Sequence, residues 1–149
     1  MGSVNMRVCG VEISGNDAII SLLSQNDGIF NIPECRVSRI TCQNPDRVED
    51  LRYLQKTFLQ LVQDYKVDLV VIRERLKKGK FAGGANGFKI EAALQLTPGL
   101  SSMLMTSTDL KAHLKHYPMP ISFVETGLKK FQEPSFTTAF AYFASKHKW

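Results

Sequence analysis

A glutamate lies between two arginines directly after an apolar run near the middle of the chain. Residues 67–72 read VDLVVI, and Arg73, Glu74 and Arg75 follow. The β-branched run predicts a strand that is buried on both faces. A buried strand that ends in charge indicates that its last side chains are delivered to a functional site. The alternative is a surface ion network of Glu74 with Arg73 and Arg75, or with a lysine, which would contribute little to stability.

Basic residues gather around this strand end and again later in the chain. They are Arg73, Arg75, Lys77, Lys78 and Lys80 in the glycine-rich segment 73–87, and then Lys129 and Lys130. Clustered lysines and arginines are typical of a loop that contacts the phosphates of DNA or RNA. Phe81, in the same segment, could stack on a base. A solvated loop face without a ligand is the alternative explanation.

The glycine-rich segment matches no established phosphate-binding motif. Gly79-Lys80 and Gly83-Gly84 do not satisfy GxxxxGK[ST], and neither GxGxxG nor GxSxG occurs in the chain. This disfavours a P-loop nucleotide hydrolase and a serine hydrolase. A binder of small molecules or nucleotide phosphates stays open as a weaker alternative.

Length and composition predict one globular domain, residues 6–149. The chain has 149 residues, 44% of them hydrophobic and 22% charged, and no apolar run approaches the roughly 20 residues of a membrane span, so no membrane partner is expected. Three cysteines without CxxC spacing favour a reducing, cytoplasmic location. The net charge of +5 is compatible with a polyanionic partner. Residues 1–5 resemble a non-native leader or a disordered tail.

The periodicity and turn signals predict an α/β fold. Strands are expected at residues 6–13, 18–23, 28–40 (interrupted at Pro33), 67–72 and 101–105, and helices from Asn44 to about residue 65, at 88–96, at 107–116 and from Glu133 onward. Three antiparallel strands followed by alternating helices and strands indicate a mixed five-stranded sheet with helices on both faces.

This order of elements resembles the ribonuclease-H-like superfamily, and most closely its branch of RuvC-type resolvases. VCGVEISG at residues 8–15 is similar to that family's opening strand, whose pattern is roughly G-I-D-x-G. VDLVVIRE at residues 67–74 resembles its fourth strand, which ends in a catalytic glutamate. The likeness runs over about residues 6–145. It points to a small bacterial family whose function the resemblance leaves open.

The resemblance implies a set of site residues and a chemistry. Glu12, Glu74 and Glu133 match the superfamily's catalytic acids, which would bind Mg²⁺ or Mn²⁺. Two such cations about 4 Å apart hold the attacking water and the leaving oxygen during phosphodiester hydrolysis. The implied substrate is DNA or RNA, bound by the basic residues named above. RuvC-type resolvases act as dimers, so a homodimer is expected.

Two departures from the superfamily pattern keep a second function open. Glu12 stands where the family has aspartate, and the last helix offers Ser135, Thr137 and Thr138 where aspartates are typical. The first hypothesis, from the resemblance, is a metal-dependent nuclease. The alternative is a nucleic-acid-binding or scaffold protein in which the catalytic site has decayed.

Overall fold

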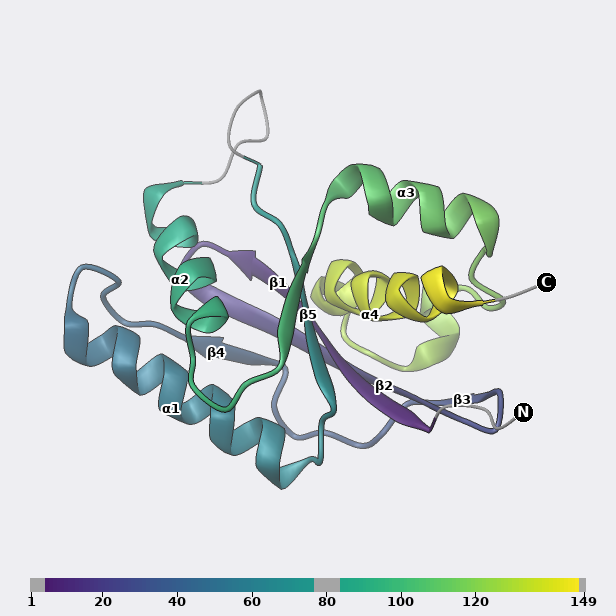
Figure 1. Ribbon diagram of the computed structural model, residues 1–149, viewed down its shortest axis with the longest axis horizontal. Coiled ribbons are helices and arrows are strands. Elements are labelled where there is room, and N and C mark those ends of the chain that lie inside the picture. The colour runs from purple at the N-terminus through teal and green to yellow at the C-terminus, as the bar shows by residue number, and fades with distance from the viewer. Residues whose placement is uncertain (1–4, 77–83, 148–149) are drawn as a thin grey trace.

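The computed structural model describes residues 5–76 and 84–147, in which strands and helices alternate after an initial run of strands (Figure 1). The strands are β1 (Met6–Ser14), β2 (Asp17–Asn26), β3 (Ile29–Asn31), β4 (Arg39–Thr41), β5 (Leu69–Arg73) and β6 (Ser102–Met105). The helices are α1 (Val48–Asp64), α2 (Ala85–Gln95), α3 (Ser107–His116) and α4 (Glu133–Lys146), with short 3-10 helices η1 (Phe123–Thr126) and η2 (Lys130–Gln132). The predicted α/β class is confirmed.

One mixed sheet organises these elements, in the order β3-β2-β1-β5-β6, with β4 also pairing with β2. β1 runs antiparallel to β2 and parallel to β5, and β5 runs parallel to β6. Because β1 and β5 are parallel neighbours, their carboxyl ends meet at the same edge of the sheet. Ligands of open α/β sheets commonly bind outside such strand ends.

The sheet has six strands, so the predicted count of five is wrong. The expected third strand is divided into β3 and β4, which pair with opposite ends of β2. Pro33 lies between them, and proline has no N–H to donate to a neighbouring strand. In the intervening chain the Cys35 thiol donates to the Val37 carbonyl oxygen at 3.2 Å, and the Ser38 carbonyl oxygen accepts the Ile20 N–H of β2 at 3.0 Å.

The helices cover both faces of the sheet, as predicted, and they divide the core in two (Figure 1). On one face α1 and α2 contribute Phe58 and Leu94, which belong to the same buried cluster as Val11 of β1. On the other face α4 contributes Phe140, which shares a cluster with Val8. Alternate residues of β1 therefore face opposite layers, and Glu12 falls on the α4 side with Val8.

Helix α4 lies directly against β1 at Gly10. A Cβ at Gly10 would overlap the Ser135 carbonyl oxygen and would come within 2.9 Å of the Ala139 nitrogen. The missing side chain thus allows the first turns of α4 to contact the strand backbone. Glu12 follows two residues later on the same face of β1.

The starts of two helices differ from the predictions. α1 begins at Val48 and not beside Asn44. Asn44 closes a separate turn, in which its side-chain oxygen accepts the Asp46 N–H and its carbonyl oxygen accepts the Arg47 N–H, each at 3.0 Å. α2 begins at Ala85, earlier than the predicted residue 88.

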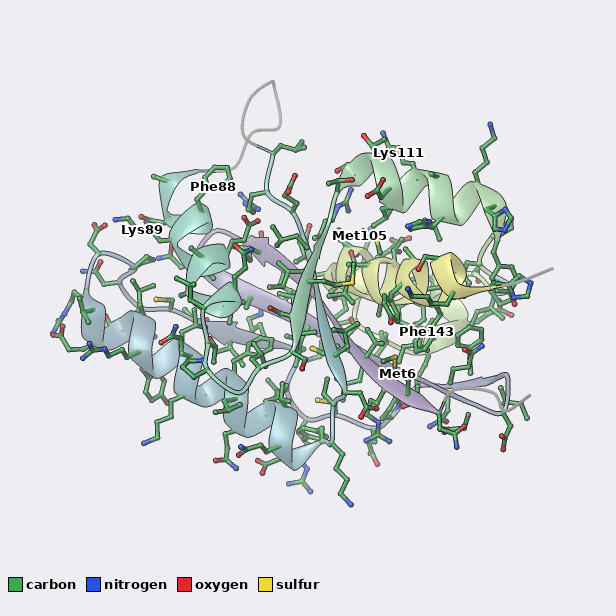
Figure 2. All side chains as sticks on the ribbon, in the orientation of Figure 1. Met6, Phe88, Lys89, Met105, Lys111 and Phe143 are labelled. Carbon is green, nitrogen blue, oxygen red and sulfur yellow. The ribbon has the colours of Figure 1, made fainter. Side chains whose placement is uncertain are left out.

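Side chains connect the outer helices to the rest of the fold (Figure 2). Lys89 on α2 forms an ion pair with Asp46, ahead of α1. Met105 of β6 and Phe143 of α4 are buried together in the cluster beneath α3 and α4. Within residues 5–76 and 84–147, no helix is long and apolar enough to cross a bilayer.

Candidate functional site

A polar pocket of about 210 Å³ lies at the sheet edge where β1 and β5 end. Its lining residues are Glu12, Ile13, Arg73, Glu74, Arg75, Leu76 and Ser107. Two carboxylates and two guanidiniums share this space, and their formal charges cancel. We call it the carboxyl-edge pocket.

Strand pairing explains why Glu12 and Glu74 reach the same pocket. The parallel β1–β5 ladder pairs Val11 with Ile72, so Glu12 emerges beside the end of β5. The Glu74 N–H donates to the Met105 carbonyl oxygen of β6 at 2.9 Å, which holds the chain in line just beyond β5. The structure therefore brings these two predicted acids together, while their catalytic role stays a prediction.

The Glu12 carboxyl is partly buried in this pocket, and burial affects its pKa. Burial raises the pKa of Glu12 above its ordinary value of 4.5, and the Arg73 and Arg75 guanidiniums partly oppose that rise. No ion pair between described residues includes Glu12 or Glu74. The guanidiniums therefore influence Glu12 across the pocket and not through an ion pair. Glu74 likewise forms no ion pair with Arg73 or Arg75, and Lys77, Lys78 and Lys80 lie outside the described residues.

Arg75 is held between α2 and the end of β1. Its backbone N–H donates to Glu91 Oε2 at 2.7 Å, and its Nη1 donates to the Ile13 carbonyl oxygen. A Cβ at Gly87 would lie 2.9 Å from Arg75 Nε, so this glycine leaves room for the guanidinium. The Nε itself has no hydrogen-bond partner among the described residues. Gly87 and Glu91 are one helical turn apart, and together they position Arg75.

Glu91 is the residue of this region that the sequence analysis missed. Its side chain is 6% exposed, and it lies beside the buried Ile90 and Leu94 on α2. An acidic residue within the buried part of a helix was the signal that could have identified it, because buried carboxylates need hydrogen-bond partners. Glu91 is a positioning residue, since it contacts the backbone of Arg75 and does not line the pocket.

The third predicted acid, Glu133, lies apart from Glu12 and Glu74. It is exposed at the first residue of α4 and is not among the lining residues of the pocket. Farther along α4, Ser135 and Thr138 are fully buried. The Ser135 hydroxyl bonds to the Ser21 hydroxyl at 2.6 Å, and the Thr138 hydroxyl donates to the Pro134 carbonyl oxygen at 2.8 Å. α4 therefore adds no carboxylate to the pocket.

The donor set of the pocket does not fit a pair of divalent cations. In the part of the chain that the structure describes, no three His, Cys, Asp or Glu side chains are grouped so as to hold a metal ion. Two cations in one site need several carboxylate oxygens. Here two carboxylates share the space with Arg73 and Arg75, whose positive charges oppose an incoming cation.

The predicted basic residues fall into three groups. Arg73 and Arg75 line the carboxyl-edge pocket. Lys129 and Lys130 are exposed where η2 begins, just before α4. Lys77, Lys78 and Lys80, together with Phe81, lie outside the described residues.

Two solved structures share this architecture across nearly the whole chain. One is RuvC from Thermus thermophilus, with a TM-score of 0.69, 11% sequence identity and 95% of each chain covered. The other is Thermus thermophilus RuvC in complex with a Holliday junction substrate, with a TM-score of 0.63, 11% identity, and 95% of this chain and 94% of that chain covered. At this identity the likeness concerns the fold alone. The chain thus has the ribonuclease-H-like fold of the RuvC type, as predicted.

Sequence comparison places the chain in a family. The family described as "Protein of unknown function (DUF3010)" matches residues 6–142, and the chain belongs to it. Comparison with curated proteins gives no significant match.

Proposed function

We propose that this member of the DUF3010 family binds nucleic acid at the carboxyl edge of its ribonuclease-H-like sheet without assembling a two-metal catalytic site. The observation that carries the proposal is the presence of two arginines beside only two carboxylates in one pocket. Arg73 and Arg75 share the space with Glu12 and Glu74. Arg73 is a half-buried cation at the end of β5, and we assign it to a phosphate of the bound strand.

The charge of the chain supports this assignment. The net charge is +5, and the segment that directly follows the pocket residues adds Lys77, Lys78 and Lys80. Cations along one stretch of chain attract a polyphosphate backbone irrespective of its sequence. The Arg75 N–H donates to Glu91 and its guanidinium donates to the Ile13 carbonyl oxygen. We therefore expect Arg75 to shape the pocket while Arg73 contacts the ligand.

A metal-dependent nuclease is the second candidate, because Glu12 and Glu74 lie in one pocket at neighbouring strand ends. Mg²⁺ and Mn²⁺ take oxygen ligands of this type. The candidate requires a further carboxylate to join them, and Glu133 is the one that the family resemblance implies.

Binding is tested by fluorescence anisotropy with labelled single-stranded DNA, duplex DNA, a four-way junction and RNA, over a range of salt. Arg73→Ala should weaken binding about 10-fold and should lower the slope of log K against log salt by about 0.7 to 0.9, the loss expected for one phosphate contact. The matched control is Arg52→Ala, which removes the same charge from an exposed position on α1, on the opposite face of the sheet. Equal effects of the two substitutions would refute the assignment of Arg73.

Cleavage is tested on the same substrates with millimolar Mg²⁺ or Mn²⁺. We expect every substrate to stay intact, with no metal-induced rise in the thermal midpoint of unfolding. Cleavage that disappears in both Glu12→Gln and Glu74→Gln would instead establish the nuclease candidate.

A homodimer belongs to the same proposal, since two copies would present two pockets to one branched ligand. Light scattering coupled to gel filtration should then give twice the monomer mass of 16.7 kDa. A monomer in the presence of a four-way junction would remove this part of the proposal.

A further inference from the structure

Basic side chains gather near the ring of Phe131, ahead of α4. The Arg39 guanidinium carbon lies 4.2 Å from the ring centroid, and Lys129 Nζ lies 5.9 Å from it. Lys130 is exposed next to the ring residue. We call Arg39, Lys129, Lys130 and Phe131 the Phe131 patch.

Arg39 is held in its place over the ring. Asp17 Oδ2 accepts a hydrogen bond from Arg39 Nη1 at 3.1 Å. The other oxygen of Asp17 accepts the Thr41 hydroxyl at 2.5 Å, which fixes the carboxylate in turn. The guanidinium is therefore ordered between a carboxylate and an aromatic ring, and a ligand would not have to order it.

The turn that carries Phe131 is anchored to the sheet. Gln132 is 6% exposed, and its side-chain Nε2 donates to the Ile20 carbonyl oxygen of β2 at 2.8 Å. Its Oε1 accepts the Lys129 N–H at 3.0 Å, so the same side chain closes the turn. Hydrogen bonds of Gln132 thus connect the turn that carries Phe131 and Lys129 to β2.

Arg39 of the Phe131 patch lies in one row of the sheet with Glu12 of the carboxyl-edge pocket. Glu12 of β1 pairs with Ile19 of β2, and Ile19 pairs with Arg39 of β4. Directly paired residues point to the same face, so Glu12 and Arg39 share the α4 face. Two strand spacings, about 10 Å, separate them. Stacked nucleotides advance about 3.4 Å each, so a strand of about three nucleotides spans the distance.

The composition of the patch favours an unpaired base with its phosphates over other anions. An aromatic ring stacks on a base of any identity, and the surrounding cations attract the adjoining phosphates. The bases of a duplex are already stacked on each other, and the carboxylates of an acidic peptide would gain little from the ring. The patch keeps a net positive charge, because Asp17 neutralises only Arg39 and not Lys129 or Lys130.

We propose that the Phe131 patch holds an unpaired base of a single strand that also crosses the carboxyl-edge pocket. The base stacks on the ring face of Phe131 opposite the Arg39 guanidinium, and Lys129 and Lys130 contact the phosphates beside it. This inference rests on the proposed nucleic-acid binding and adds its substrate class, which is single-stranded nucleic acid or an unpaired region of a branched one.

The test compares Phe131→Ala with wild type by anisotropy, using a labelled single strand and a duplex of the same sequence. Loss of one stacked base should weaken single-strand binding about 5-fold or more, and duplex binding should change less than 2-fold. The matched control is Tyr53→Ala, which removes an aromatic side chain that is 64% exposed on α1, on the other face of the sheet. Phe131→Tyr keeps the ring and should retain wild-type binding. If Phe131→Ala does not fold, Phe131→Leu replaces it, because leucine fills the space without a ring.

The outcomes separate this inference from the proposed function. Wild type that binds neither strand nor duplex would defeat both. Wild type that binds the single strand, with Phe131→Leu or Phe131→Ala binding equally well, would overturn the inference and leave the proposed function standing. Displacement of the oligonucleotide by poly-glutamate at equal charge would also overturn it, in favour of an acidic protein partner.

Discussion

Polar side chains at the ends of β1 and β5 differ in their surroundings from those at the start of α4. At the strand ends, Glu12 and Glu74 reach an open pocket, and neither forms a direct ion pair with another described residue. At the start of α4, the hydroxyls of Ser135 and Thr138 are buried and bonded within the protein.

The start of α4 therefore packs against the sheet, whereas the ends of β1 and β5 form a region that can bind a ligand. Buried polar groups with internal partners stabilise one arrangement of the chain. Polar groups that line a pocket without such partners can exchange water for a ligand. In the superfamily pattern both regions would supply acids to one site, whereas here the start of α4 serves packing. Three substitutions test this division, and their expected effects decrease in order.

Gly10→Ala should have the largest effect, on the packing region. The new Cβ would overlap the Ser135 carbonyl oxygen, and neither backbone can move without displacing α4. Overpacking of this kind costs about 3 kcal/mol or more of unfolding free energy. Gly84→Ala is the control, because a Cβ there meets nothing within 4 Å. Urea unfolding measures both, and similar stability of the two variants would show that α4 does not depend on Gly10.

Glu91→Ala should have an intermediate effect, on the pocket region, because Glu91 on α2 bonds to Arg75 just beyond β5. It removes the acceptor of the Arg75 N–H and leaves that donor without its partner, at a cost of about 1 to 3 kcal/mol. Glu91→Gln keeps an acceptor oxygen and should recover most of the stability. Because Glu91 positions Arg75 beside the pocket, Glu91→Ala should also weaken nucleic-acid binding, while Glu91→Gln should not. If Glu91→Ala is destabilised but binds nucleic acid as well as wild type, Arg75 does not contribute to the ligand site.

Glu12→Gln should have the smallest effect, and it should depend on pH. Burial raises the pKa of Glu12 in the folded protein, so the folded state holds its proton to a higher pH than the unfolded state. Ionisation of Glu12 therefore lowers the stability as pH rises from about 4.5 through the folded pKa, and the full stability is present below that window.

Glutamine removes this titration. The variant should match wild type at pH 4 and exceed it at pH 7 by less than about 1 kcal/mol, since the pocket is open to solvent. Thermal unfolding across this range measures the difference. A gain in stability at low pH, or a loss at neutral pH, would contradict the raised pKa.

Local patterns were sufficient to predict the elements that form the pocket. The β-branched run before Arg73 predicted a strand covered on both faces, and Val70, Val71 and Ile72 are fully buried. The apolar run of β5 and its charged end are properties of neighbouring residues, so they can be predicted without a partner strand. Glu74 was placed at the sheet edge in this way.

Contacts between distant segments could not be predicted from such patterns. Glu91 and Arg75 are 16 positions apart, and nothing in either segment indicates that a buried carboxylate accepts the backbone N–H of the other. The division of the third strand depended on β2, because Pro33 is unfavourable only where a neighbouring strand needs its N–H.

The sequence by itself determined the α/β order, the two apolar faces of the sheet and the presence of one glutamate and two arginines at the end of β5. Those features follow from side-chain periodicity and charge, which act between near neighbours. The tertiary structure alone decided that Glu12 joins Glu74 while Glu133 stays apart, and that Arg39 covers Phe131. Strand register and the close contact of α4 with Gly10 set those distances, and both arise from packing between segments far apart in the chain.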